Sequence, residues 1–257
     1  MQKSVSGNEQ YEDLNEDRYK SYYRHSGRSE TLEEIWSNAF GNNYPVGLNH
    51  FGFLTNTDLK MFISLLTTKQ GDVLLDIGCG KGGPGLKIAE EKKLKLFGID
   101  IIPEAIGEAN LLKENFNLSY KPKFEVGGFC NIPMPSNSVD SIISIDAFWM
   151  VKNKVEALKE IKRVAKSGAQ FIFTTWDSVL LDQSLLMTAH GFQVISKVET
   201  EQWKMYQMKI YSDILKYKDQ LLEEMGEAAN ILISEAKTVP LMIDASIRRF
   251  YHASINK

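Results

Sequence analysis

VLLDIGCGKGG, the stretch from Val73 to Gly83, decides the fold of this 257-residue chain. An apolar run containing Asp76 leads into closely spaced glycines, among them Gly78 and Gly80, and a helical pattern follows directly. Glycines let a backbone turn sharply and approach a ligand without a Cβ clash. A helix that starts there offers free N–H groups with partial positive charge. The stretch therefore predicts a strand, a ligand-binding turn and a helix.

From about residue 72 onward, short apolar runs alternate with helical stretches, which is typical of βαβ units and a parallel sheet. The expected strands cover 73–77, 95–99, 122–126, 139–145, 169–175, 192–199 and 248–255. The expected helices between them cover 83–92, 103–116, 153–165 and 179–189.

The flanking segments predict additional helices around this core. Residues 1 to about 30 are charged and tyrosine-rich and indicate an arm. Thr31 and Glu34 form a capping-box pattern for a short helix that ends at Gly41, and a second helix is expected over 56–66. A nearly unbroken helical tract runs from 202 to 236. These patterns divide the chain into an arm with cap helices (1–68), a core (69–200), a helical cap insert (201–246) and a final core strand (247–257).

A second acid favours a ribose at the glycine turn. The segment KLFGID ends in Asp100, twenty positions after Gly80, where a carboxylate can accept hydrogen bonds from ribose hydroxyls. Gly78, Gly80 and Gly83 also satisfy the dinucleotide spacing, so an NAD(P)-dependent oxidoreductase is an alternative. Asp76 would repel a nearby phosphate but attract an amino group. The turn therefore favours S-adenosylmethionine over a dinucleotide.

Taken together, D-x-G-x-G-x-G (Asp76 to Gly82), GID ending in Asp100, and RVAKSGAQFIFTTW (Arg163 to Trp176) resemble class I S-adenosylmethionine-dependent methyltransferases of the small-molecule group. The resemblance covers about residues 70–200. It implies a Rossmann-like α/β fold, with a mostly parallel seven-stranded sheet in the order 3214576 and helices on both faces. It also implies that the chain is an enzyme that moves the methyl group, by in-line displacement in a capped pocket, to a nitrogen or oxygen of a small molecule and leaves S-adenosylhomocysteine.

The resemblance also implies how the cofactor is held. The glycine turn, with Asp76, Gly78, Cys79 and Gly80, would bind the methionine end, and Asp100 would bind the ribose. The segment VGGFCNIPMP carries Gly128 where the family usually has an acid that binds the adenine amine. Adenine would then be recognised by backbone groups and apolar contacts from three residues, which are Gly128, Phe129 and Ile101.

Candidates for the chemistry come from position, because methyl transfer needs alignment and exclusion of water more than a fixed motif. Asp146 and Trp149 follow the fourth strand; Asp146 is expected to contact the cofactor and to orient or deprotonate the acceptor. Trp149 and Trp176 could form an aromatic wall that favours a cation. Tyr44 and His50 are candidate substrate contacts from the loop before 56–66.

The arm segment YKSYYRHSGR adds further candidates. Tyr22 and Tyr23 are candidate catalytic residues, and Arg24 could close over the methionine carboxylate. Tyr19, His25 and Arg28 belong to the same segment. His190 and His252 are expected to be structural.

Composition excludes several classes of function. Thirty Lys and Arg against 33 Asp and Glu give a formal charge of −3, without the basic stripe that nucleic acids require. Cys79 and Cys130 have no neighbours at metal-ligand spacing, so no metal is expected. A polar N-terminal stretch and the absence of a long apolar run predict no signal peptide and no membrane span, hence a cytoplasmic protein. Oligomeric state is left open, as is a non-catalytic S-adenosylmethionine-binding module.

Overall fold

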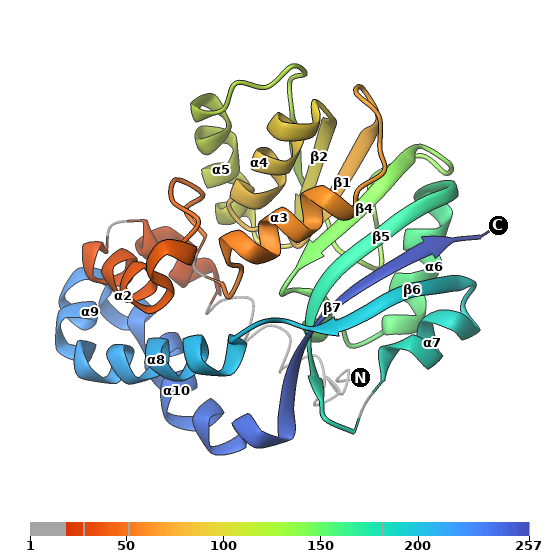
Figure 1. The fold of residues 1–257 in the computed structure, drawn as a ribbon. Helices are drawn as coiled ribbons and strands as arrows, with labels where there is room; N and C mark the ends of the chain where they lie inside the picture. Colours follow the sequence, from red (N-terminus) through yellow and green to blue (C-terminus); the bar gives the residue numbers. More distant parts are fainter. Residues whose placement is uncertain (1–18, 28, 51, 181, 257) are drawn as a thin grey trace, which may run out of the picture.

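A seven-stranded sheet forms the centre of the computed structural model, which describes residues 19–27, 29–50, 52–180 and 182–256 (Figure 1). The strand order is β3-β2-β1-β4-β5-β7-β6, and β7 runs antiparallel to both of its neighbours. The predicted strand order and the mostly parallel sheet are therefore confirmed. The strands are β1 (Val73–Ile77), β2 (Lys95–Asp100), β3 (Lys123–Val126), β4 (Val139–Ile145), β5 (Ala165–Ser178), β6 (Phe192–Glu199) and β7 (Ser246–Ile255).

The register of the parallel strands brings the candidate acids to one edge of the sheet. Asp76 of β1 lies opposite Gly98 of β2 on one side and Ile143 of β4 on the other. Asp100 ends β2 and Asp146 directly follows β4. Because carboxyl ends of parallel strands share an edge, the three carboxylates gather where α/β folds bind their ligands.

Helices cover both faces of the sheet, as the alternating pattern predicts. On one face, α3 (Asn56–Leu65), α4 (Gly83–Lys92) and α5 (Pro103–Leu112) contribute to one buried apolar cluster. On the other face, α6 (Lys154–Val164) and α7 (Gln183–Ala189) contribute to a second. The helix expected over 179–189 begins only at Gln183, because β5 continues to Ser178 and pairs there with Ser246 of β7.

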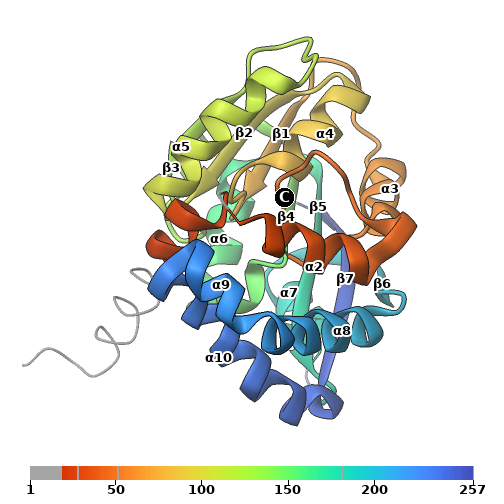
Figure 2. The same ribbon diagram turned by 90° about the vertical axis from the view of Figure 1, so that its left-hand side faces the viewer.

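A third apolar cluster lies beside the sheet and joins distant parts of the sequence (Figures 1 and 2). The arm helix (residues 19–26) and α2 (Glu30–Phe40) pack there against α8 (Trp203–Lys216), α9 (Lys218–Met225) and α10 (Asn230–Thr238). The helical tract expected to be nearly unbroken is interrupted at Tyr217 and again at Gly226, whose φ of 59° no right-handed helix allows. We call this group of helices the cap.

The start of α2 differs from the sequence pattern. Ser29, not Thr31, caps the helix, and its hydroxyl accepts the Leu32 N–H at 3.0 Å. The Thr31 hydroxyl donates instead to Glu224 of α9 at 2.6 Å. Because α2 already begins at Glu30, Thr31 lies inside the helix and its hydroxyl joins α2 to α9 instead of capping α2.

Candidate functional site

The glycine turn after β1 is fixed to the end of β2. Gly78 and Gly80 have φ values of 71° and 54°, a region that favours glycine. The Gly78 and Cys79 N–H groups donate to the Ile99 carbonyl at 2.8 and 3.0 Å. A Cβ on Gly78 would lie 2.5 Å from the Cβ of Ala147, just after β4. The turn therefore fits closely between the ends of β2 and β4.

Asp100 holds the turn from the other side. One carboxylate oxygen accepts the Gly80 N–H and the other accepts the Ile102 N–H, each at 2.9 Å. Burial raises the pKa of Asp100, and these bonds to the ionised form oppose the rise. The carboxylate is thus aimed at the glycine turn, where a ribose is expected.

Asp76 is also buried, but among the described residues no backbone N–H groups stabilise its carboxylate as they do that of Asp100. Its carboxylate packs against Gly85 of α4, where a Cβ would collide with it. Within the described part of the chain no group donates a hydrogen bond to it. Burial and the neighbouring Asp100 raise the pKa of Asp76 to about 8. An ammonium group beside Asp76 would reverse this rise, because it stabilises the ionised form.

The three residues expected at the adenine lie close together. Ile101 is 53% exposed, and a Cβ on Gly128 would lie 3.0 Å from its Cγ2 atom. Phe129 contacts Phe148 with ring centroids 5.6 Å apart and reaches within 3.7 Å of a Cβ placed on Gly78. The structure therefore brings an apolar surface next to the glycine turn, and it offers backbone rather than a carboxylate at Gly128.

The arm helix covers the glycine turn. The Tyr23 hydroxyl would lie 2.9 Å from a Cβ on Gly80, and burial together with the nearby Asp100 raises the pKa of Tyr23. Tyr22, beside it, is buried in the cap, which raises its pKa as well. The two tyrosines therefore face different partners, since Tyr23 meets the turn and Tyr22 meets the cap helices.

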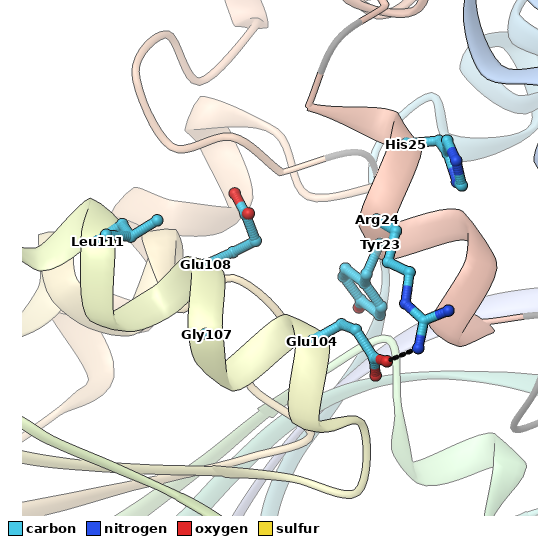
Figure 3. Close-up of a pocket in the computed structure, with 7 residues that line it drawn as sticks. All are labelled: Tyr23, Arg24, His25, Glu104, Gly107, Glu108 and Leu111. Atoms are coloured by element: carbon cyan, nitrogen blue, oxygen red, sulfur yellow. Dashed lines mark hydrogen bonds and ion pairs between the residues drawn. The ribbon is translucent and has the colours of Figure 1, made fainter.

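Arg24 contacts α5 instead of the glycine turn. Its guanidinium donates to Glu104 at 2.5 Å, and the arginine side chain is 61% exposed (Figure 3). A pocket of about 570 Å³ lies there between the arm helix and α5, and its lining includes Tyr23, Arg24 and Glu108. This pocket does not reach Asp146, Trp149 or Trp176. Arg28 and residues 1–18 of the arm lie outside the described residues.

Asp146 is engaged in a buried ion-pair network. Arg248 of β7 donates from Nε and Nη2 to the two carboxylate oxygens at 2.9 and 3.0 Å, and the Phe53 N–H donates at 3.2 Å. Burial alone would raise the pKa of Asp146, but Arg248 outweighs it and holds the pKa below its usual value. Arg248 also donates to Asp58 of α3 at 2.9 Å. In this arrangement Asp146 is ion-paired rather than free to remove a proton.

The remaining candidates are spread around this network. Trp149 is 43% exposed and donates its indole N–H to the Asp146 carbonyl at 2.8 Å. Trp176 lies edge-on to Phe53 and Trp203, with centroids 5.3 and 5.2 Å apart. Tyr44 packs in the cap against Phe40. The structure thus brings Trp176 to the network, leaves Trp149 at its surface and holds Tyr44 within the cap.

Sequence reasoning missed Arg248, Asp58 and Phe53, which complete the network. The sequence does contain a signal for Arg248. Two arginines begin the expected strand RRFYHASI, although charged residues are rarely buried in a strand unless they are paired. Asp58 is also the third residue of the capping box that Thr55 opens at α3. Because the capping role is enough to explain an acid at this position, the sequence gives no sign that Asp58 also pairs with Arg248.

The fold and the site together define a class of protein. A seven-stranded sheet in this order, with a glycine turn after β1 and an acid at the end of β2, is the Rossmann-like fold of class I S-adenosylmethionine-dependent methyltransferases. A family model described as a methyltransferase domain matches residues 68–229. The chain belongs to this family.

Similar sequences come from methyltransferases of several small molecules. A sterol 24-C-methyltransferase of Gibberella zeae is 35% identical over 108 residues, which is 42% of this chain and 28% of that protein. The ajmaline N-methyltransferase of Rauvolfia serpentina is 35% identical over 38% of this chain and 34% of its own length. 24-Methylenesterol C-methyltransferase 2 of Arabidopsis thaliana is 26% identical over 62% and 49%. The matched stretch therefore spans half or less of each of these relatives.

Solved structures share the fold at low sequence identity. The [4+2]-cyclase SpnF matches with a TM-score of 0.71 and 16% identity, over 88% of this chain and 93% of that one. Haemonchus contortus phosphoethanolamine N-methyltransferase 2, in complex with phosphomonomethylethanolamine and S-adenosylhomocysteine, matches with a TM-score of 0.66 and 21% identity, over 87% and 57%. One of these neighbours is a cyclase, so the likeness speaks for the fold alone.

Two further features bear on cofactors and location. Among the described residues, no group of three or more His, Cys, Asp or Glu side chains is placed to hold a metal ion. None of the helices in those residues is both long enough and apolar enough to span a bilayer.

Proposed function

We propose that this chain is a methyltransferase that takes the methyl group of S-adenosylmethionine to a nucleophilic atom of a small molecule. The observation that carries the proposal is the pair of buried acids at the glycine turn. Asp100 accepts the Gly80 N–H of the turn and the Ile102 N–H at the start of α5, whereas Asp76 is buried without a donor among the described residues. Membership of the methyltransferase domain family supports it.

The residues present fit this cofactor. The carboxylate of Asp76 would receive the ammonium group of the methionine end. Gly78 and Gly80 let the turn pack against Ala147 and Tyr23, where a Cβ would collide. Asp100 would accept from the ribose, and Ile101, Gly128 and Phe129 would contact the adenine. Cys79 would contribute its backbone at the turn.

The chain itself would contribute alignment and exclusion of water. When bound, the cofactor supplies an electrophilic methyl group. The arm closes the glycine turn from solvent through Tyr23, and the cap covers the strand ends beside it. Asp146, fixed by Arg248, would orient groups at the end of β4 rather than remove a proton. Arg24 would have to leave Glu104 to reach the methionine carboxylate.

The division of the chain follows from these roles. We assign residues 1–68 to the arm and first cap helices, 69–200 to the cofactor-binding core, 201–246 to the helical insert that completes the cap, and 247–257 to the last core strand. The shared apolar cluster of the arm, α2 and α8–α10 supports this assignment, because both segments of the cap pack together.

The experiment that tests the proposal is calorimetric titration of the purified protein with S-adenosylmethionine, S-adenosylhomocysteine and NADH, after co-purified ligand is removed. We expect saturable binding of both adenosyl compounds and none of NADH. Asp76→Asn should weaken that binding, whereas Asp219→Asn, on the exposed side of α9, should leave it unchanged. Binding of NADH alone would favour an oxidoreductase, and adenosyl binding without methyl transfer to any acceptor would favour a non-catalytic binding module.

A further inference from the structure

An aromatic wall lies beside the end of β4. The Phe53 backbone donates to Asp146, and its ring lies edge-on to Trp176 and to Tyr211 of α8, with centroids 5.3 and 6.1 Å apart. Phe53 thereby joins the core sheet to the cap. Ala147, the next residue after Asp146, packs against Gly78 of the glycine turn. The wall of Phe53, Trp176 and Tyr211 therefore stands next to the methionine end of the proposed cofactor site.

Two buried hydrogen-bonding atoms near this wall have no partner in the described residues. These are Nε2 of His50 and Oε1 of Gln207. The amide nitrogen of Gln207 donates to the Tyr211 hydroxyl at 3.3 Å, which ties Gln207 to the wall. His50 is close enough to Asp146 and Arg248 for both to influence its charge. A buried acceptor without a donor costs about 1–3 kcal/mol, so a ligand that donates to these atoms would be favoured.

The buried charges beside the wall sum to a negative value. Asp58 and Asp146 share the single guanidinium of Arg248, which leaves a formal charge of −1 on the three side chains. Burial and Arg248 lower the pKa of His50 to about 4 against the opposing effect of Asp146, so His50 is neutral at pH 7 and does not cancel this charge. A net negative environment stabilises positive charge that develops on a nearby atom.

The chemistry of transfer distinguishes amines from alcohols at such a wall. A neutral amine attacks the methyl carbon with its lone pair, the carbon–sulfur bond breaks with its electron pair going to sulfur, and the nitrogen becomes an ammonium. That ammonium loses a proton to water afterwards. An alcohol must instead give its proton to a base as the bond forms. The pKa of Asp146 is lowered and that of His50 is about 4, so both are weak bases for this task, and Tyr211, whose pKa burial raises, is protonated.

We propose that the methyl acceptor is an amine with an apolar, aromatic-sized body, whose N–H donates to Nε2 of His50 while its lone pair faces the methyl group. His50 is then in its Nδ1–H tautomer, and Oε1 of Gln207 accepts from a second donor of the same molecule. Phe53, Trp176 and Tyr211 contact the apolar body. This inference rests on the proposed function and specifies the substrate class of that site.

Matched pairs of small acceptors test the inference directly. The purified protein is incubated with methyl-labelled S-adenosylmethionine and either benzylamine or benzyl alcohol, and likewise with tryptamine or tryptophol. We expect label in the amines and not in the alcohols, with a rate that rises with pH as the neutral amine becomes more abundant. Label in an alcohol in preference to its amine, or label in neither member of either pair, overturns the inference.

Variants of His50 test its role in binding the amine. His50→Ala should lower kcat/KM for the amine about tenfold, the scale expected for one lost hydrogen bond at a buried donor. His50→Gln, which restores an acceptor, should recover part of that loss. His190→Ala, at the end of α7 outside the site, is the matched control and should behave as the unaltered protein. Equal kcat/KM in His50→Ala and the unaltered protein overturns the assignment.

Titration of every variant with S-adenosylmethionine separates failure of the proposed function from failure of the amine inference. If the unaltered protein binds no S-adenosylmethionine, the proposed function itself fails. If each variant binds the cofactor as the unaltered protein does and the acceptor results contradict the expectation, only the amine inference fails. Unfolding of His50→Ala would appear as lost cofactor binding, in which case His50→Gln carries the test.

Discussion

Asp76 and Asp100 show how two buried carboxylates at one sheet edge acquire different properties from their neighbours. Asp100 accepts two backbone N–H groups, which stabilise its ionised form. Asp76 is enclosed by β1 and α4 without such donors among the described residues, and its pKa is about 8 instead of 3.8. Backbone donors therefore stabilise the ionised form of Asp100, whereas a nearby cation would be needed to do the same for Asp76.

The raised pKa of Asp76 predicts a pH dependence of stability in the absence of ligand. Because the folded protein binds this proton more tightly than the unfolded chain, the contribution to stability is full below about pH 4 and is lost as the pH rises through about 8. Asp76→Asn has no carboxyl group to ionise at this position. The difference between its free energy of unfolding and that of the unaltered protein should therefore shift in favour of the variant as the pH rises from 5 to 9. Urea denaturation at several pH values measures the difference, and a constant difference would contradict the assignment.

Removing the Asp100 carboxylate should weaken the cofactor site. In Asp100→Ala the Gly80 and Ile102 N–H groups lose their acceptor and the ribose loses its partner, at a cost of about 1–3 kcal/mol in S-adenosylmethionine affinity. Calorimetric titration measures this, and Asp219→Ala, at an exposed position of α9, is a control for general loss of charge. If Asp100→Ala binds S-adenosylmethionine as tightly as the unaltered protein, Asp100 does not bind the ribose.

At this scale the sequence predicted the local part of the site and missed the long-range part. The glycine turn and Asp100 belong to one βαβ unit, so their spacing along the chain is enough to place them together. Arg248 meets Asp58 and Asp146 across 190 and 102 positions, and no local pattern encodes such a pairing. The role expected for Asp146 therefore depended on a partner that the sequence could not indicate.

At the scale of elements, the start of α4 packs closely against a loop. A Cβ on Gly83, the first residue of α4, would overlap the backbone carbonyl of Leu48 in the loop before α3. Backbone cannot move aside as a flexible side chain can. The loop that carries Tyr44 and His50 is thereby held against the helix that follows the glycine turn.

Two glycine-to-alanine substitutions separate this packing from helix propensity. Gly83→Ala should destabilise the protein by about 1–3 kcal/mol, because the added methyl group forces the loop away from α4. Gly107→Ala, within α5 where nothing lies within 4 Å, should stabilise it by about 0.5–1 kcal/mol. Thermal and urea denaturation of both variants measures the two changes in stability, which should have opposite signs. Equal changes would show that the contact with Leu48 does not contribute to stability.

The helices and strands were predicted best where a pattern of apolar residues within the element itself defines them. The strands over 73–77, 139–145 and 192–199 agree with β1, β4 and β6, since alternating or continuous apolar runs define them. The start of α7 was wrong because pairing with β7, distant in the sequence, extends β5. The breaks between the cap helices also escaped prediction, although Gly226, a residue type that commonly ends helices, marks one of them in the sequence.

For the whole molecule, the network of Asp58, Arg248 and Asp146 joins α3, β7 and β4 across the sheet. Arg248 is 1% exposed, and among the described residues Asp58 and Asp146 are the acids that pair with it. Arg248→Met should destabilise the protein by about 3–5 kcal/mol, because it leaves two buried carboxylates without a counter-ion. Combining it with Asp58→Asn and Asp146→Asn should recover much of the loss, and urea denaturation of both proteins measures it. A triple variant no more stable than Arg248→Met would show that charge is not the cause.

The position of β7 has a consequence for how the protein is made. β7 follows every other strand in the chain, yet it lies between β5 and β6 in the sheet. Synthesis proceeds from the N-terminus, so the glycine turn, Asp58 and Asp146 leave the ribosome before Arg248 does. A translation product cut short before Ser246 would carry two uncompensated acids and a gap in the sheet. Until β7 is inserted, β5 and β6 therefore lack their shared neighbour, and Asp58 and Asp146 lack the guanidinium that joins them.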